Sequence, residues 1–189
     1  MPERLEDFEL IGRFKRGDTA AFEEIVLKYQ DRIYNVCRGM LANPHDAEDT
    51  AQEIFLKAFQ ALDKFNPDAS LYTWLYRIAV NTCLDHRKSF FSGFFACSRE
   101  VGDVLKDIPA DGPSPDRVLE SRQIRGRLDA ALGKLPYKLR IVIVLKEFEG
   151  LSYEEIAGVL DISAGTVKSR ISRARERLRE SFKDFREQI

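Results

Sequence analysis

The sequence predicts an all-α protein built as two small helical domains joined by a flexible linker, the C-terminal domain being a helix-turn-helix. Apolar residues recur at helical spacing along most of the 189 residues, and long alternating runs of β-branched or aromatic residues are absent. The helical pattern is interrupted once by a stretch rich in glycine, proline and acidic residues. We therefore predict domains at 1–89 and 121–189, joined by a linker at 90–120.

The N-terminal domain reads as a series of helices with clear boundaries. Asp18 is a candidate N-cap for the first of them, and Asn43-Pro44 ends that helix and starts the next. Residues 45–64 and 70–88 carry apolar residues at helical spacing, with a turn at 66–68 between them. The domain is thus expected to pack as a small helical bundle.

The apolar run 141–145 allows two interpretations, a buried strand or a buried helix. It lies between a helix start at Pro136 and a turn at Gly150, and no second strand is available to pair with it. A buried helix is therefore the better prediction.

Composition and charge limit the class of protein. Hydrophobic residues make up 44% of the chain and charged residues 32%, which is too apolar for disorder and too charged for a membrane protein. The N-terminus has neither the basic nor the apolar segment of a secretory signal, so we expect a cytoplasmic protein without membrane insertion. The net charge of −1 is unevenly distributed, because residues 121–189 hold 15 basic against 10 acidic side chains. A basic C-terminal third favours a polyanionic partner.

The strongest local pattern is a helix, a tight turn and a basic helix near the C-terminus. Ser152 and Glu155 have the spacing of a capping box, and 161–165 is a short connection. The helix 166–179 has a narrow apolar stripe and six basic residues against one acid. This order is typical of helix-turn-helix DNA binding, in which the second helix enters the major groove. Its first turn offers Thr166, Lys168 and Ser169 to base edges, and the alternative is a merely solvated basic face.

Two further patterns lie in the N-terminal domain. Asp49, Gln52, Phe55 and Phe59 fall on one side of a helix, and this mixture suits a protein partner, although the two aromatics could equally be core. The segment 64–77 combines aromatic, amide and arginine side chains, which suit unstacked bases. Within it, burial in the core is the better interpretation for Trp74.

Several motifs in this order resemble one family, the small extracytoplasmic-function (ECF) sigma factors of bacterial RNA polymerase. The matching segments are DAEDTAQE at 46–53, ALDKF at 61–65, YTWLYRIAVNT at 72–82, LP at 135–136, EGLSYEEIA at 149–157 and GTVKSRISRAR at 165–175.

The resemblance implies three groups of binding residues and no catalytic chemistry. Core polymerase would be bound by Asp49, Gln52, Phe55 and Phe59. The melted minus-10 element would be held by Phe65, Asn66, Asp68, Ser70, Tyr72, Arg77 and Asn81. The minus-35 duplex would be read by Tyr153, Glu154, Thr166, Lys168, Ser169, Arg170, Ser172, Arg173 and Arg175. The implied partners are core RNA polymerase, promoter DNA and an anti-sigma factor.

Two other functions are compatible with a basic helix-turn-helix. The chain could be an ordinary helix-turn-helix repressor or activator, which would bind duplex DNA as a dimer without polymerase, or a protein-interaction module with a basic helix. The chain has an odd number of cysteines, and no two of them form a C-x-x-C pair; they are Cys37, Cys83 and Cys97. We therefore expect no disulfide framework, no metal site and no cofactor. The chain also has no glycine-rich nucleotide-binding loop, and an enzyme is not expected.

Overall fold

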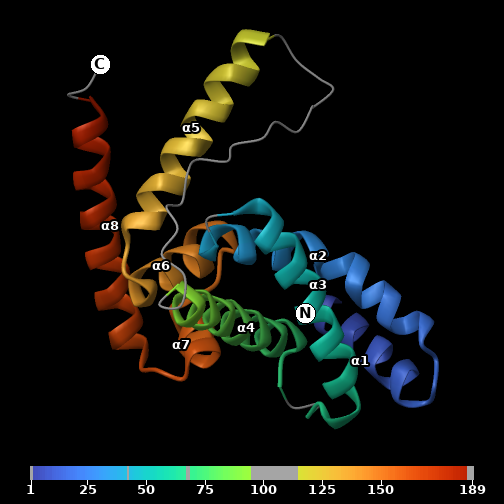
Figure 1. Cartoon of the computed structure of the whole chain (residues 1–189). Coiled ribbons are helices and arrows are strands. Elements are labelled where there is room, and N and C mark those ends of the chain that lie inside the picture. Colours follow the sequence, from blue (N-terminus) through green and yellow to red (C-terminus); the bar gives the residue numbers. More distant parts are fainter. Residues whose placement is uncertain (1, 42, 67–68, 95–114, 187–189) are drawn as a thin grey trace.

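The computed structural model describes residues 2–41, 43–66, 69–94 and 115–186, and all regular structure in them is helical (Figure 1). The predicted all-α class and its two helical groups are therefore confirmed. The N-terminal half consists of α1 (Pro2–Lys15), α2 (Ala20–Met40), α3 (Pro44–Ala61), η1 (Leu62–Lys64) and α4 (Leu71–Phe94). The C-terminal half consists of α5 (Pro115–Lys134), α6 (Tyr137–Ile143), η2 (Val144–Phe148), α7 (Tyr153–Leu160) and α8 (Ala164–Arg186). Much of the predicted linker, 95–114, lies outside the described residues.

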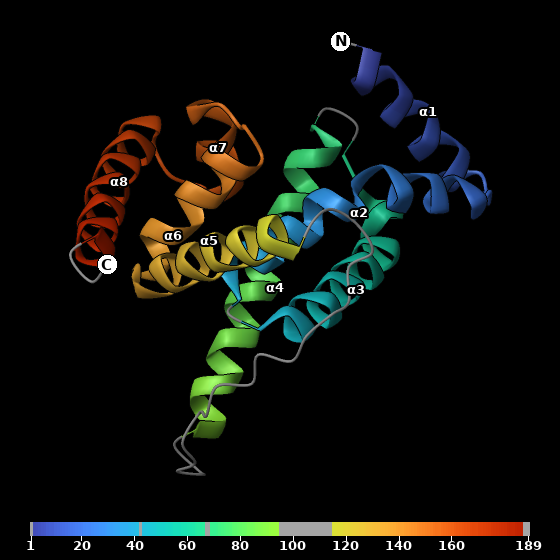
Figure 2. The ribbon, with the colours of Figure 1, turned by 90° about the horizontal axis from the view of Figure 1, so that it is seen from above.

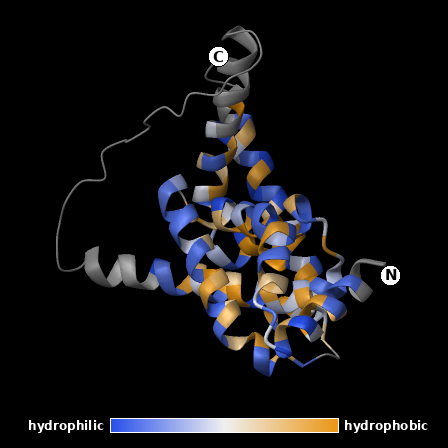
Figure 3. Cartoon of the chain, turned by 90° about the vertical axis from the view of Figure 1, so that its right-hand side faces the viewer, coloured by the Kyte–Doolittle hydropathy of each residue, from blue (hydrophilic) through white to orange (hydrophobic). Residues whose placement is uncertain are grey.

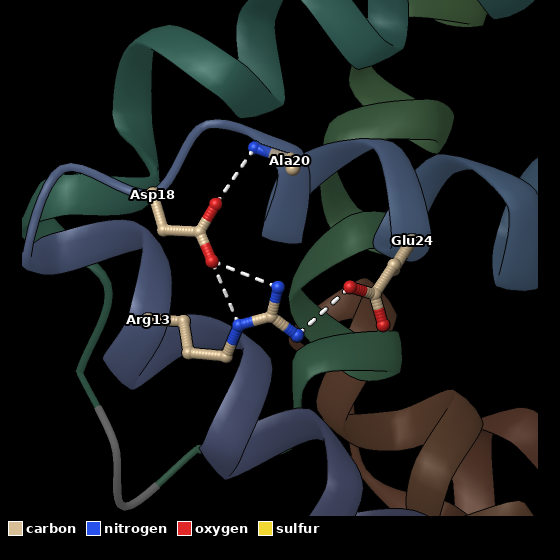
Figure 4. Close-up of polar contacts among 4 residues, drawn as sticks. All are labelled: Arg13, Asp18, Ala20 and Glu24. Atoms are coloured by element: carbon tan, nitrogen blue, oxygen red, sulfur yellow. Dashed lines mark hydrogen bonds and ion pairs between the residues drawn. The ribbon is translucent and has the colours of Figure 1, made fainter.

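Helix α1 is an element that the sequence analysis did not predict. Its buried residues Leu10, Ile11 and Phe14 pack on the core of the N-terminal half. The turn that follows is held by Arg13, whose guanidinium reaches Asp18 and Glu24 at 2.8 Å each (Figure 4). These ion pairs fix α1 against the start of α2.

Local capping signals define the starts of α2 and α3. The Asp18 side chain accepts a hydrogen bond from the backbone N–H of Ala20 at 3.1 Å, although the residue at the N-cap position itself is Thr19. Asn43 caps α3 by accepting from His45 N–H at 3.0 Å, and Pro44 follows in the first turn. The start of α3 at Asn43-Pro44 agrees with the sequence prediction. The N-cap of α2 lies one residue after the predicted Asp18.

The apolar run 141–145 is helical and buried along its whole length, as predicted. It continues from α6 into η2, which has the wider π-helical turn, and packs against α2 and α8. A continuous apolar sequence here reflects a segment surrounded on all sides, rather than a strand.

The two halves share one hydrophobic core, and we call their contact the seam. Figures 1 and 2 both show α6, α7 and α8 on one side, α1 and α3 on the other, and α4 between them. Figure 3 shows hydrophobic positions concentrated among the packed helices. The core cluster runs without a break from α1 to α8. The prediction of two helical units therefore needs one addition, which is that the units are packed together.

Polar and steric contacts tie α2 to the C-terminal half across this seam. The buried Arg140 guanidinium donates to the Met40 carbonyl at 3.0 Å, and Arg38 pairs with Asp129 at 2.7 Å. Gly39 packs against Val144 so closely that an added Cβ would lie 2.7 Å from a Val144 methyl carbon. A larger residue at position 39 would therefore force Val144 or the packed helices to shift.

No helix in the described part of the chain combines the length and the apolar character that crossing a membrane requires.

Candidate nucleic-acid interface

Helices α7 and α8 form the predicted helix-turn-helix. The capping box is present in full, with Glu155 N–H donating to Ser152 Oγ at 3.2 Å and Ser152 N–H donating to the Glu155 carboxylate at 2.7 Å. Asp161 ends α7 in the left-handed conformation at φ 53°, which turns the chain sharply toward α8. Ser163 Oγ then accepts from Thr166 N–H at 3.1 Å and caps the second helix.

Helix α8 is fixed by its apolar stripe and presents a basic face outward. Val167, Ile171 and Ala174 are buried, as their spacing predicts. The side chains of Lys168, Ser172, Arg173, Arg175, Arg177 and Arg179 are exposed. Lys168, Ser172 and Arg175 are four and three residues apart, so they lie on one side of this exposed surface.

The other predicted minus-35 residues occupy less open positions. Thr166, Ser169 and Arg170 are half-buried, and the Ser169 hydroxyl donates to the Thr166 carbonyl at 2.9 Å. On α7, Glu154 is exposed, whereas the Tyr153 ring lies under the Lys146 ammonium at 5.3 Å. The candidate duplex-reading surface is therefore concentrated on the outer face of α8.

Arg175 is exposed but forms an ion pair within the chain. Its guanidinium pairs with Glu147 at 2.6 Å, and this hydrogen bond raises the pKa of the guanidinium further. The pair ties α8 to η2. A DNA phosphate that paired with Arg175 would have to displace Glu147. Arg175 differs from Arg173 in this respect.

The loop before α4 is anchored by its aromatic residue. The Phe65 ring is only 3% exposed and stands edge-on to Trp74 at 5.2 Å, while the Phe65 carbonyl accepts from Lys15 Nζ at 2.9 Å. The Phe65 ring fills the core under the loop in this arrangement, and its contact with DNA stays a prediction. Asn66 is exposed and Ser70 half-buried, whereas Asp68 lies outside the described residues.

The α4 residues predicted for minus-10 DNA face the C-terminal half. The Tyr72 hydroxyl donates to the Glu155 carboxylate, and burial together with this hydrogen bond raises the pKa of Tyr72 to about 12. Arg77 donates through two nitrogens to the Gly158 carbonyl, at 2.8 and 2.5 Å. Asn81 lines a cavity of about 430 Å³ that is bounded by α4, α6, α7 and α8. Arg77 and Asn81 are four residues apart and share one side of α4, whereas Tyr72 lies roughly 140° around the helix from Arg77.

Two tyrosines at the seam were missed by the sequence analysis. Tyr76, on α4, donates to the Glu149 carboxylate at 2.7 Å, and Tyr137, on α6, donates to the Val80 carbonyl at 2.9 Å. Burial is the main reason that the pKa of each tyrosine and of Glu149 is raised. No local signal marks these residues, because their partners are far away in the sequence.

The candidate protein-binding face lies on α3. Asp49 and Gln52 are exposed, and Phe55 is half-buried against the core. Phe59 remains 42% exposed while its ring meets those of Phe14 and Phe22 edge-on, at 5.3 and 5.1 Å. Phe59 thus combines a core contact with an outer surface, and both interpretations of it apply.

Leu56, also on α3, was missed as well. It is 64% exposed beside this face. The signal that could have found it is an apolar residue outside the buried stripe of its helix.

The two described cysteines lie together in the core. Cys37 and Cys83 are buried with their Sγ atoms 3.8 Å apart, and the hydrogen bond between them, reinforced by burial, raises the pKa of Cys37. Both are free thiols, and Cys97 lies outside the described residues. Within the described ranges, no group of three histidine, cysteine or acidic residues is gathered as a metal ion would require.

Comparison with known proteins bears directly on these surfaces. Residues 25–89 match Sigma-70 region 2, and residues 125–178 match Sigma-70 region 4. The RNA polymerase sigma-H factor of Pseudomonas aeruginosa is 43% identical over 179 residues, which cover 90% of this chain and 91% of that protein. The ECF RNA polymerase sigma factor SigW of Bacillus subtilis is 40% identical over 179 residues, covering 93% and 96%.

Solved structures give the same answer for the fold. CnrH, in complex with the cytosolic domain of CnrY, superposes with a TM-score of 0.71 at 28% identity, covering 95% of this chain and 98% of that one. RpoE of Bartonella quintana, in complex with the anti-sigma factor NepR, has a TM-score of 0.71 at 26% identity, covering 86% and 96%. Because relatives of about 40% identity span nearly the whole chain, and both sigma regions match in order, this protein belongs to the ECF family of RNA polymerase sigma factors.

Proposed function

We propose that this chain binds core RNA polymerase and directs it to specific promoters, reading the minus-35 element as duplex and the minus-10 element as a melted strand. The observation that carries the proposal is the exposed basic face of α8, displayed by a fully capped helix-turn-helix. Members of this family are transcription initiation factors, and we assign no catalytic residue and no cofactor.

For the minus-35 element, α8 enters the major groove with its N-terminal turns. Lys168, Ser172 and Arg173 are exposed there and have the length and donors to reach base edges. Arg170, Arg175, Tyr153 and Glu154 lie at the border, where they would meet or flank the phosphate backbone. Thr166 and Ser169 contribute from the first turn.

For the minus-10 element, the loop before α4 and residues of α4 hold an unpaired strand. Asn66 and Ser70 supply the loop contacts, with Asp68 predicted alongside them, and Tyr72, Arg77 and Asn81 supply stacking and polar contacts. Opening a base-pair step costs on the order of 1–2 kcal/mol, and stacking a base on an aromatic side chain returns about 1–3 kcal/mol. Captured bases can therefore offset much of the cost of melting.

For the polymerase, the exposed face of α3 is the binding surface. Asp49 and Gln52 provide polar contacts, with Phe55 and Phe59 as the apolar part, and a central apolar group inside a polar rim is the usual anatomy of a protein interface. We further propose that residues 1–89 and 121–189 act as separate domains on the polymerase, with 90–120 as the tether.

An anti-sigma factor is a further proposed partner. CnrH and RpoE, which share the fold, are each found with a second protein, and for RpoE that protein is an anti-sigma factor. We propose that this chain is controlled in the same way.

The test is transcription from a pool of genomic fragments by core polymerase with and without this chain. The proposal expects a discrete set of transcripts that appears only when both are present and that shares two sequence elements upstream of each start. A chain that selects no start sites, or that binds duplex DNA tightly as a dimer and ignores polymerase, would overturn it.

A matched pair of variants tests the polymerase surface. Asp49→Ala combined with Gln52→Ala should weaken core binding at least tenfold, which corresponds to about 1.4 kcal/mol. Glu23→Ala combined with Gln30→Ala removes the same two chemical groups from exposed positions of α2 and should leave affinity unchanged. Equal affinities for the two double variants in a pull-down titration would contradict the assignment.

A further inference from the structure

Two arginine side chains line a small cavity where α2, α5 and α6 meet. The cavity has a volume of about 10 Å³, and its lining includes Arg38 of α2, Asp129 of α5 and Arg140 of α6. The remaining residues of the lining carry no charge. A volume of this size holds one particle with the dimensions of a water molecule or a small ion. The cavity therefore has room for a single ligand of that kind.

Each of these arginines keeps one buried nitrogen donor without an acceptor among the described residues. The two donors are Nη1 of Arg38 and Nε of Arg140. The other terminal nitrogens are in use, because Arg38 Nη2 pairs with Asp129 at 2.7 Å and Arg140 donates through Nη1 and Nη2 to backbone carbonyls. Buried donors in folded proteins nearly always have a hydrogen-bond partner, because burial removes the bulk water that would accept from them. Two unpaired donors beside one cavity therefore favour an acceptor inside it.

The charge around the cavity favours an anion as this acceptor. The printed acceptors of the Arg140 guanidinium are backbone carbonyls, and no carboxylate in the described part of the chain pairs with it. Burial and the positive charge of Arg87 both lower the pKa of Arg140. Asp129 balances the charge of Arg38, so the positive charge of Arg140 is left over in the lining. A buried charge is costly without a counter-charge, which an anion supplies and a water molecule does not.

We propose that this cavity binds one halide ion of the size of chloride, which accepts hydrogen bonds from Arg38 Nη1 and Arg140 Nε. The volume of the cavity favours a monatomic anion over phosphate or a carboxylate, because each of these has several heavy atoms. The ion is shared by α2 and α6, and it joins the two halves of the chain beside the Arg38–Asp129 ion pair. The site belongs to the folded chain itself and does not depend on the proposed function.

Bromide is the probe for a direct test, because it substitutes for chloride and its anomalous scattering identifies it in a crystal. Crystals of the natural chain grown in sodium bromide should show one anomalous peak inside the cavity, in contact with both unpaired nitrogens. A water molecule in the cavity, with bromide absent or present on the outer surface as an adventitious ion only, would overturn the proposal.

A titration in solution measures the contribution of the ion to the fold. Sodium chloride replaces sodium gluconate at constant ionic strength, and unfolding by urea is followed at each chloride concentration. A ligand that binds only the folded chain stabilises it by an amount that grows with the logarithm of the free ligand concentration once the site is mostly filled. The urea midpoint of the natural chain should therefore rise by equal steps for each tenfold increase in chloride. A midpoint that does not respond to chloride would contradict the proposal.

A matched pair of variants separates the halide ion from the ion pair beside it. Arg38→Met and Asp129→Asn both remove the Arg38–Asp129 ion pair, so its loss is common to them. Arg38→Met also removes a donor and a positive charge, and its urea midpoint should no longer respond to chloride. Asp129→Asn keeps both donors and removes a negative charge from the lining, so its response should begin at a chloride concentration severalfold lower than in the natural chain. The same response in both variants would refute the site, because a general effect of salt on the protein surface does not distinguish them.

Discussion

The exposed face of α8 and the residues of α4 that contact the C-terminal half are the two surfaces proposed for promoter DNA, and the fold treats them differently. On α8, Lys168, Ser172 and Arg173 project outward from a helix that is held in place by its own apolar stripe. On α4, Tyr72 and Arg77 donate to α7 across the seam. The first surface is complete within one half of the chain. The availability of the second depends on where the other half lies.

This difference teaches that a helix can be fixed by local sequence while its function is set by a distant contact. Changes at the seam should affect the free energy of unfolding. Changes on the outer face of α8 should affect DNA binding without altering the fold. The predictions below separate these two classes of effect.

The largest expected effect is on stability, through Arg140. Its guanidinium is buried and donates to the carbonyls of Met40, Gly133 and Leu135, at 3.0, 2.6 and 3.2 Å. Arg140→Met keeps most of the volume but leaves buried acceptors unpaired, so we expect a loss of about 3 kcal/mol in the free energy of unfolding. Urea denaturation measures it. Arg140→Lys, which retains a charged donor, should lose less, and equal midpoints for both variants and the natural chain would refute the role of these bonds.

The next effect leaves the fold intact and changes DNA recognition by α8. Arg173→Ala should cost about 1–3 kcal/mol on the cognate minus-35 element and relax its sequence preference. Arg179→Ala, further along the same helix, should weaken all sequences about evenly and lower the salt slope by about one. Binding of the polymerase complex to cognate and scrambled elements at two salt concentrations measures both. If Arg173→Ala weakened both elements equally, its assignment to base contact would be wrong.

The features that could be predicted from the sequence are those set by residues close together in the chain. The capping box of Ser152 and Glu155 and the Asn43-Pro44 boundary are signals within a few residues, and both were predicted correctly. The buried helix at 141–145 followed from the absence of any partner strand. These predictions depend on chain-local chemistry, which a sequence displays directly.

The features that were missed depend on partners far away in the chain. The burial of helix α1 arises from packing on α2. Phe65 has the composition of a base-stacking residue, but Trp74 and the core determine where its ring lies. The seam links Tyr76 to Glu149, 73 residues apart, and no local pattern specifies such a pair.

A smaller effect is expected from one hydrogen bond at the seam. Tyr137→Phe removes only the hydroxyl that donates to the Val80 carbonyl, and we expect a loss of about 0.5–1.5 kcal/mol in stability. Tyr34→Phe is the matched control, because Tyr34 is half-buried on α2 and its hydroxyl has no hydrogen bond to the described residues of the C-terminal half. Comparable losses in the two variants would mean that the measured effect does not come from the seam.

The smallest effect is a pH dependence centred on Glu149. Burial raises the pKa of this carboxyl, although the Tyr76 hydroxyl on α4 and the charge of Arg32 on α2 act in the opposite direction. One of its carboxylate oxygens is buried without a hydrogen-bond partner. A raised pKa means that the folded chain holds its proton more tightly than the unfolded chain does. The stability from this group is therefore fully present below the ordinary glutamate pKa of about 4.3 and is lost as pH rises through the raised value.

The comparison of the natural chain with Glu149→Gln isolates this contribution. The amide mimics the neutral carboxyl, and its oxygen still accepts from Tyr76, so its contribution is independent of pH. The difference in unfolding free energy between the two chains should shift in favour of Glu149→Gln as pH rises from about 4 to 7. A difference that stays constant with pH, or shifts the other way, would show that Glu149 does not titrate at the seam.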